Sequence, residues 1–326
     1  MMFPSYSIFR QKCSFLFNEF KIHFYDICRD IKYSNGFYND DKEEKLLTVI
    51  VVDSHSIEKG LTMPNGRLGF GKAKILTLIK NCDTYKRNYN IKDELFLEAL
   101  GVIKEYLHNH EVSNYVLDSE IINNSNSLLN SFDHADKTIQ PQQTNVEYFQ
   151  HANSSFELFS ASRRSLRSFS GKIPADDLLN AINLANSAPS TCNRQSTRIH
   201  VVNDEFKKQQ LLKIQSGNRG FGHLADSLII ITSDLASWSG GRLRNGPYVD
   251  GGIFTMNLLY SLHYYKIAAC SLNLYLSVKK DKKFREIISI PNNETIIVMI
   301  AVGNVPEVIN IAKSGRKNQK SILSIH

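Results

Sequence analysis

Apolar residues recur with helical or strand spacing along the second half of the chain. Pro174 precedes a pattern in which apolar side chains return every three to four residues, which indicates the start of an amphipathic helix. Short apolar runs bounded by polar residues indicate buried strands. The predicted strands are residues 198–202, 227–232 and 295–303, and the predicted helices begin at Pro174 or span residues 204–215 and 250–266. Because helices and strands do not alternate regularly, the pattern predicts an α+β fold.

The first half of the chain has a mostly helical pattern. Residues 1–35 mix aromatic and basic side chains at helical spacing, and residues 42–110 predict further helices around the turn PNGRLGFGK at 64–72. The aromatic and basic stretch suits a surface for nucleic acid or membrane, and packing onto the core explains it equally well. The sequence predicts a mostly helical N-terminal extension over residues 1–118.

The composition changes after this extension. Residues 119–154 are rich in Asn, Ser and Gln and poor in periodic apolar side chains, which is typical of a linker or mobile loop. We therefore expect residues 119–154 to connect the extension to a second domain over residues 155–326.

Composition narrows the class of protein. Hydrophobic residues make up 42% and charged residues 22% of the 326 residues, as in ordinary globular proteins. The five cysteines include no CxxC pair, which argues against a disulfide framework or a zinc site and for a reducing compartment. No apolar run is long enough to span a bilayer, and the first residues lack the pattern of a signal peptide. We therefore expect a cytoplasmic protein without a membrane span.

The chain is basic, with a net charge of +7 and a sequence pI of about 9.0. Such a charge permits contact with nucleic acid or an anionic membrane but does not require it. The basic residues are dispersed, and the dense cluster at 279–283 fits a solvated helix face. We expect no nucleic-acid partner.

The segment SRRSLRSF at 162–169 is the strongest candidate for chemistry. It sets Arg163 and Arg167 around Ser165, at what the pattern predicts to be the entry to a helix. Guanidinium groups are permanently charged planar donors and a helix N-terminus adds unpaired N–H groups, so this arrangement suits a phosphate. The turn APSTCNRQ at 188–195 carries small and amide side chains that suit the edge of a heteroaromatic ring. Together the two segments predict a site for a flat, phosphorylated cofactor.

These two segments belong to an ordered set of motifs. The set comprises R-x-S-x-R at 163–167, A-P-S-x-x-N-x-Q at 188–195, SGNRGFGHLADSLIIIT at 216–232, YVDGGIFTMNLL at 248–259, and IAVGNVPE at 300–307 followed by Lys313 and Arg316. Over about residues 155–317 this order resembles the nitroreductase-like flavoprotein family. Its members bind FMN at a homodimer interface in an α+β fold whose central mixed sheet is flanked by helices. The resemblance therefore implies FMN as cofactor, NADH or NADPH as electron donor, and a homodimer.

The resemblance also implies roles for particular positions. The implied contacts are Arg163, Arg164, Ser165 and Arg167 at the ribityl phosphate and the pyrimidine edge; Lys313 and Arg316 at the phosphate; Asn218 at the isoalloxazine ring; Pro189, Ser190, Asn193 and Gln195 facing the cofactor from the partner subunit or shaping its pocket; and the backbone near Asn273 and Leu274 at the flavin N5 region. We identify no general acid or base, and the catalytic residues stay unknown.

Two parts of the chain depart from or add to the family pattern. Ser196 and Thr197 stand where the family often has Pro and an aromatic residue, and KIAACSLN at 266–273 lacks the usual glycine. These departures concern the shape of the substrate side. The segment HSIEKGLTMPNGRLGFG at 55–71 is similar to an extension of nitroreductase-like proteins linked to surface-polysaccharide biosynthesis.

His55 and Glu58 of this segment could share a helix face and ligate a metal. No second pair at ligand spacing accompanies them in the sequence, so we predict an ordinary helix surface and no metal site.

The implied function is an FMN-dependent oxidoreductase that passes hydride from NAD(P)H through FMN to a small acceptor such as a nitro compound or a quinone. Two alternatives stay open. One is flavin-dependent oxidation of an intermediate in surface-polysaccharide biosynthesis. The other is non-enzymatic binding of a different anion or of nucleic acid at the basic site.

Overall fold

The computed structural model describes residues 6–34, 43–89, 91–132, 139–239 and 244–326, with side chains described from residue 12 onward. Its α-helices are α1 (Tyr6–Tyr33), α2 (Glu43–Leu61), α3 (Lys72–Asn88), α4 (Glu94–Val112), α5 (Ser119–Leu129), α6 (Asn145–Tyr148), α7 (Phe156–Ser162), α8 (Ala175–Ala185), α9 (Glu205–Ile214), α10 (Gly246–Tyr264), α11 (Val278–Ile288) and α12 (Gln319–Ile322). Its strands are β1 (Gln142–Thr144), β2 (Thr197–Val202), β3 (Ser227–Asp234), β4 (Ala268–Leu272), β5 (Glu294–Gly303) and β6 (Val308–Asn310). The residues outside this description are 1–5, 35–42, 90, 133–138 and 240–243. They include parts of the predicted helical regions and of the expected linker.

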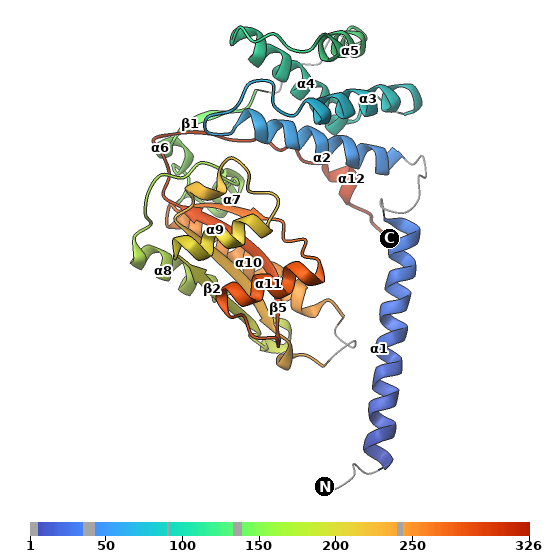
Figure 1. The fold of residues 1–326 in the computed structure, drawn as a ribbon, viewed down its shortest axis with the longest axis vertical. Helices are drawn as coiled ribbons and strands as arrows, with labels where there is room; N and C mark the ends of the chain where they lie inside the picture. Colours follow the sequence, from blue (N-terminus) through green and yellow to red (C-terminus); the bar gives the residue numbers. More distant parts are fainter. Residues whose placement is uncertain (1–5, 35–42, 90, 133–138, 240–243) are drawn as a thin grey trace.

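The second half folds around a four-stranded sheet (Figure 1). Its strand order is β2-β3-β5-β4. All its described ladders are antiparallel, whereas we expected a mixed sheet. An apolar run identifies a strand but not its direction, so the sequence pattern could not distinguish the two arrangements. The α+β class is confirmed, and so are the three predicted strands and the three predicted helices.

The alternating side chains of β3 explain the layers on either side of the sheet. Leu228 and Ile230 pack with α9 and α11 on one face. Ile229 and Ile231 pack with α8 and α10 on the other. Successive strand residues point to opposite faces, so a continuous apolar run is the pattern of a strand buried on both sides. The central strand β3 is therefore covered by helices on both faces.

The first half builds a second apolar core from α2, α3, α4 and α5. Ile50, Ile75, Leu100 and Tyr106 are fully buried in this core. The turn between α2 and α3 is also confirmed, and Gly69 has a positive φ of 71° at a point where an added Cβ would lie 2.3 Å from the Tyr115 hydroxyl. The helical layer lies along the top of the sheet domain, with α2 nearest to it (Figure 1).

The expected linker over residues 119–154 contains regular structure. Residues 119–129 form α5, in which Ile121, Ser125 and Leu128 are buried at helical spacing. Farther along, β1 pairs with β6, with Gln143 opposite Ile309. The Asn- and Ser-rich composition concealed a short apolar stripe, and a strand of three residues is too short to give a periodic signal. The described parts of this segment therefore belong to the two cores rather than to a linker.

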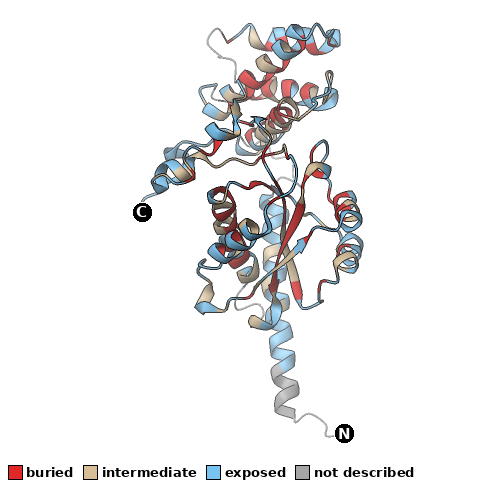
Figure 2. Cartoon of the chain, turned by 90° about the vertical axis from the view of Figure 1, so that its left-hand side faces the viewer, coloured by how far each residue is buried: buried red, intermediate tan, exposed pale blue. Residues whose placement is uncertain are grey.

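Helix α1 projects from the rest of the molecule and is exposed along its described length (Figure 2). Phe17, Phe20 and Phe24 are each more than half exposed, so their packing onto the core, one of the two interpretations of the sequence, is wrong for this chain. An ion pair of 2.9 Å between Arg244 and Asp26 joins α1 to the sheet domain. Among the described residues, none of the helices has both the length and the apolar character needed to cross a membrane.

Candidate functional site

The arginine segment is extended rather than helical. Helix α7 ends at Ser162, and Arg163 has φ −63° and ψ 129°. The Leu166 N–H donates to the carbonyl of Ala269 over 3.0 Å, which places the segment beside β4. The prediction of a helix entry is therefore wrong, and no helix N-terminus adds its dipole here. Arg163, Ser165 and Arg167 line one cavity together with Arg164, whose guanidinium donates to the Arg163 carbonyl over 2.9 Å.

Buried neighbours hold this segment in place. Leu166 is 1% exposed in the sheet core. The Tyr148 hydroxyl accepts from the Arg164 N–H and donates to the Arg164 carbonyl, both over 3.0 Å. Burial raises the pKa of Tyr148 to about 12, so this hydroxyl keeps its proton near neutral pH. The backbone that carries the arginines is thus fixed by the core.

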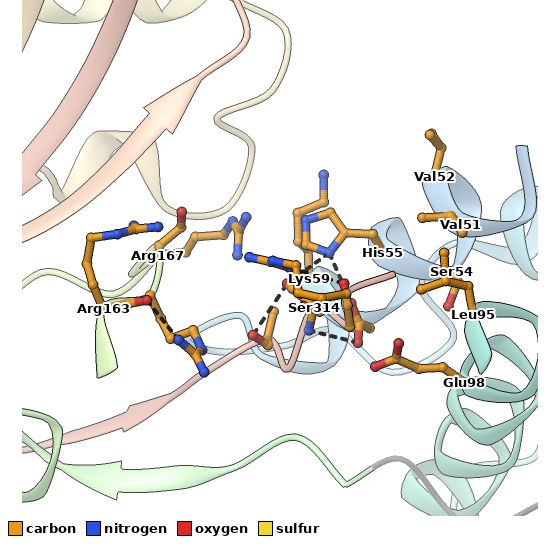
Figure 3. A pocket seen from close by; sticks show the side chains of 16 residues that line it. Val51, Val52, Ser54, His55, Lys59, Leu95, Glu98, Arg163, Arg167 and Ser314 are labelled. Carbon is orange, nitrogen blue, oxygen red and sulfur yellow. Dashed lines mark hydrogen bonds and ion pairs between the residues drawn. The ribbon is translucent and has the colours of Figure 1, made fainter. Parts of the chain in front are cut away.

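The arginine segment forms one wall of a cavity of about 410 Å³. The lining residues are Val51, Val52, Ser54, His55, Glu58, Lys59, Leu95, Glu98, Arg163, Arg164, Ser165, Arg167, Ala312, Ser314, Gly315 and Arg316. Figure 3 shows Arg163 and Arg167 on one side of the pocket, facing His55 and Lys59, with Glu98 at the other end. The pocket therefore lies between the helical extension and the sheet domain.

The arginine side of the pocket carries positive charge that the described residues do not neutralise. Arg163 Nε is buried and has no hydrogen-bond partner within the described ranges. Arg167 lies against the thiol of Cys270, whose pKa is raised mainly by burial. Neither guanidinium is ion-paired with a carboxylate of the described chain. Buried or half-buried cations without counterions are costly, so this arrangement fits a bound anion.

The C-terminal tail brings one further arginine to the pocket. Arg316 lines it, as the resemblance implies, while Lys313 is exposed and is not among the lining residues. The Lys313 N–H donates over 2.8 Å to the Gln140 side chain, which Glu105 of α4 holds in turn. Ser314 adopts a left-handed conformation with φ 51°. The tail thus turns at Ser314 and presents Arg316 but not Lys313 to the cavity.

The turn at 188–195 forms a separate group. Pro189, Ser190, Asn193 and Gln195 do not line the pocket that contains the arginines. The Thr191 N–H and hydroxyl donate to the buried carboxylate of Asp250 over 2.9 and 2.8 Å. This contact explains the aspartate of the D-G-G motif at the start of α10. Cys192, Asn193 and Gln195 all have positive φ, so Asp250 holds a turn whose backbone is strained.

Asn218, Asn273 and Leu274 form a third group away from the pocket. The Asn218 amide donates to the carbonyls of Leu212 and Gln215 over 2.7 and 2.9 Å. The Gln215 amide donates to the Asn273 carbonyl over 2.8 Å. The Asn218 donors therefore stabilise their own loop in this chain. One cavity brings together only part of the implied site.

Sequence reasoning missed the contribution of α2. His55 Nδ1 lies 3.0 Å from the buried carboxylate of Glu58, and both residues line the pocket together with Lys59. Among the described residues, no group of three or more potential metal ligands includes this pair. The only signal in the sequence was the segment HSIEKG, because proximity of α2 to the arginines depends on tertiary packing.

Replacing Asp250 by alanine is expected to destabilise the fold by about 2 kcal/mol, because the Thr191 N–H and hydroxyl lose their acceptor. Urea unfolding of the variant and the parent measures the change. Glu286→Ala removes an exposed carboxylate from α11 and should stay within about 0.5 kcal/mol of the parent. Equal stabilities of the Asp250 variant and the parent would show that the turn does not depend on this contact.

Comparison with known proteins gives the same assignment as the motifs. Residues 161–218 match the model of the nitroreductase family. A protein of Archaeoglobus fulgidus described as a "Putative NADH dehydrogenase/NAD(P)H nitroreductase" is 28% identical over 149 residues, which cover 43% of this chain and 80% of that protein. The matched family segment contains the arginine segment, the turn at 188–195 and Asn218.

Solved structures with a similar fold cover about half of the chain. An FMN-dependent nitroreductase from Clostridium difficile R20291 has 20% identity and a TM-score of 0.41, covering 52% of this chain and 96% of its own. A nitroreductase-like protein from Streptococcus mutans has 19% identity and a TM-score of 0.46, covering 52% of this chain and 97% of its own. No activity follows from overlaps of this size. The family model confirms the resemblance to the nitroreductase family over residues 161–218, the segment that carries the arginines.

Proposed function

We propose that this chain is an FMN-dependent oxidoreductase of the nitroreductase type, with NADH or NADPH as electron donor and a small molecule as acceptor. The observation that carries the proposal is the convergence of Arg163, Arg167 and Arg316 on one cavity without a carboxylate partner for either Arg163 or Arg167 among the described residues. The name of the Archaeoglobus fulgidus relative supports a nicotinamide-dependent activity.

The residues present fit the phosphate of FMN. Arg163 Nε is a buried donor without a partner in the described chain, and a phosphate oxygen would supply the acceptor it lacks. Arg167 and Arg316 add guanidinium donors, and the Ser165 hydroxyl lies on the same wall. FMN itself supplies two-electron transfer between a nicotinamide and an acceptor.

The chain's own part in this reaction is binding and orientation. The guanidinium groups neutralise the phosphate, and charge-assisted hydrogen bonds of this kind are about twice as strong as neutral ones. Tyr148 and the buried Leu166 hold the arginine backbone before the cofactor arrives, which lowers the entropic cost of binding. We assign no proton transfer to a side chain.

The proposal includes a homodimer in which the turn at 188–195 faces the cofactor of the partner subunit. This turn does not line the pocket of its own chain, so in this proposal it contacts the cofactor bound by a second copy. Apolar side chains on α8 and α10 are exposed and suit such an interface: Leu179, Leu184, Tyr248, Val249 and Ile253. The described cysteines are free, which fits a cytoplasmic protein.

Purification tests the proposal directly. The protein should be yellow, should show the absorption bands of an oxidised flavin with about one FMN per chain, and should bleach on addition of NADH or NADPH without oxygen. Protein that is colourless and that FMN cannot reconstitute would contradict the proposal and favour a non-enzymatic anion site. Protein that retains FMN but is reduced by neither NADH nor NADPH would support the cofactor and contradict the electron donor. Another reductant, or oxidation of a substrate, would then reduce the flavin.

A further inference from the structure

Helix α2 of the N-terminal extension supplies the wall opposite the arginines. His55 and Lys59 lie one helical turn apart and therefore project from the same side of α2. Figure 3 shows both side chains facing Arg163 and Arg167 across the pocket. No part of the nitroreductase-like segment at 161–218 includes them, so the extension adds a cation that the family match does not contain.

The surroundings of Lys59 favour an anion as its partner. Lys59 is half-buried, and no carboxylate of the described chain forms an ion pair with it. Burial lowers the pKa of Lys59 from its ordinary value of 10.5, and the nearby Arg167 guanidinium lowers it further. Two cations that face each other across a cavity repel, and an anion between them converts this repulsion into attraction to both.

The extension also holds the tail that carries Arg316. Ser314 N–H donates to the Glu58 carboxylate over 3.4 Å, and the Ser314 hydroxyl lies 3.3 Å from His55 Nδ1. Gly315 lies so close to the Glu98 carboxylate that a side chain at this position would displace it. Helices α2 and α4 therefore shape the tail on one side of the pocket while Lys59 reaches into the pocket itself.

We propose that the N-terminal extension completes the phosphate site, with the Lys59 ammonium binding the phosphate of FMN opposite Arg163 and Arg167. This inference rests on the proposed function, since it takes FMN as the ligand. It gives the extension a direct role in cofactor binding. Lys59 is a binding residue in this account, and the His55–Glu58 pair positions the tail.

Titration of the flavin-free protein with FMN and with riboflavin tests the role of Lys59, because riboflavin has the same ring and lacks the phosphate. In Lys59→Ala, the Kd for FMN should rise about 10- to 100-fold, the effect of losing one charge-assisted contact. The Kd for riboflavin should stay the same, and Lys59→Arg should restore most of the FMN affinity. Lys80→Ala removes an exposed lysine of α3 outside the pocket and should change neither Kd.

Each other result overturns the inference in a recognisable way. An unchanged FMN Kd in Lys59→Ala, with the parent binding FMN, would show that Lys59 does not contact the phosphate. Equal losses for FMN and riboflavin would show a structural role for Lys59 instead. Failure of the parent to bind FMN at all would reject the proposed function, and the inference with it.

Discussion

Replacing Arg163 and Arg167 together by alanine is expected to weaken FMN binding about a thousandfold, so that the purified protein loses its flavin. Both guanidinium groups line the cavity; Arg163 Nε lacks a partner in the described chain, and Arg167 contacts the Cys270 thiol rather than a carboxylate. Leu166 remains to anchor the segment in the core, so the fold should persist. Flavin content after gel filtration and the FMN Kd by fluorescence quenching measure the loss.

A matched double variant separates this effect from a general loss of positive charge. Arg87 and Arg198 are exposed arginines that form ion pairs with Asp83 and Asp234 away from the pocket. Replacing both by alanine removes the same charge and should leave flavin content unchanged. Full flavin content in the Arg163 and Arg167 variant would show that the phosphate lies elsewhere.

The stability of the fold is expected to decrease as the pH falls from about 6.5 to about 4, and His263 is the cause. This residue is buried, and burial together with the nearby Arg163 and Arg164 guanidinium groups lowers its pKa to about 4. The unfolded chain, with a histidine pKa near about 6.5, takes up the proton first as the pH falls. The contribution of neutral His263 to the free energy of unfolding is therefore fully present above about pH 6.5. About 3 kcal/mol of this free energy is lost by about pH 4.

His263→Phe should remove this part of the pH dependence. The site is lined by Tyr148, Phe149 and Phe159, whose rings accept an aromatic side chain. Ser162, which contacts His263 Nε2, still donates to the Phe159 carbonyl over 2.9 Å. Urea unfolding between about pH 4 and 7 gives the free energy of unfolding of both proteins. In the difference between the two values, the contributions of the titrating groups that both proteins contain cancel. Parallel pH curves for the two proteins would exclude His263 as the cause.

The sequence identified the arginines of the site but not the conformation that makes them effective. R-x-S-x-R predicts the entry to a helix, whereas the segment follows the end of α7 and lies beside β4. Local sequence could not reveal this, because Leu166 becomes a buried anchor only when Ala269 of β4 lies next to it. Strand β4 itself was missed, since AACSL has few of the branched and aromatic residues that mark strands.

The remaining differences have the same physical origin in tertiary packing. Long apolar runs such as β3 specify their elements well because burial dominates their composition. The helix after Pro174 is marked instead by its proline start and its amphipathic spacing, with Ala181 and Ala185 as its buried residues. By contrast, Lys59 became part of the candidate site only through the packing of α2 against the tail at Ser314. No periodicity in the sequence connects α2 to this tail. The family match at 161–218 begins after Lys59 and ends before Ser314, so it includes neither.

Phosphorus-31 NMR of the FMN-loaded protein tests the central claim most directly, since it reports on the phosphate in the cavity between α2 and the arginine segment. The second pKa of a free phosphate monoester is about 6. Surrounded by Arg163, Arg167 and Lys59, the phosphate should stay a dianion, so its resonance should not move between about pH 5.5 and 8. A resonance that titrates near about pH 6 like that of free FMN would show that the phosphate is not held by these cations.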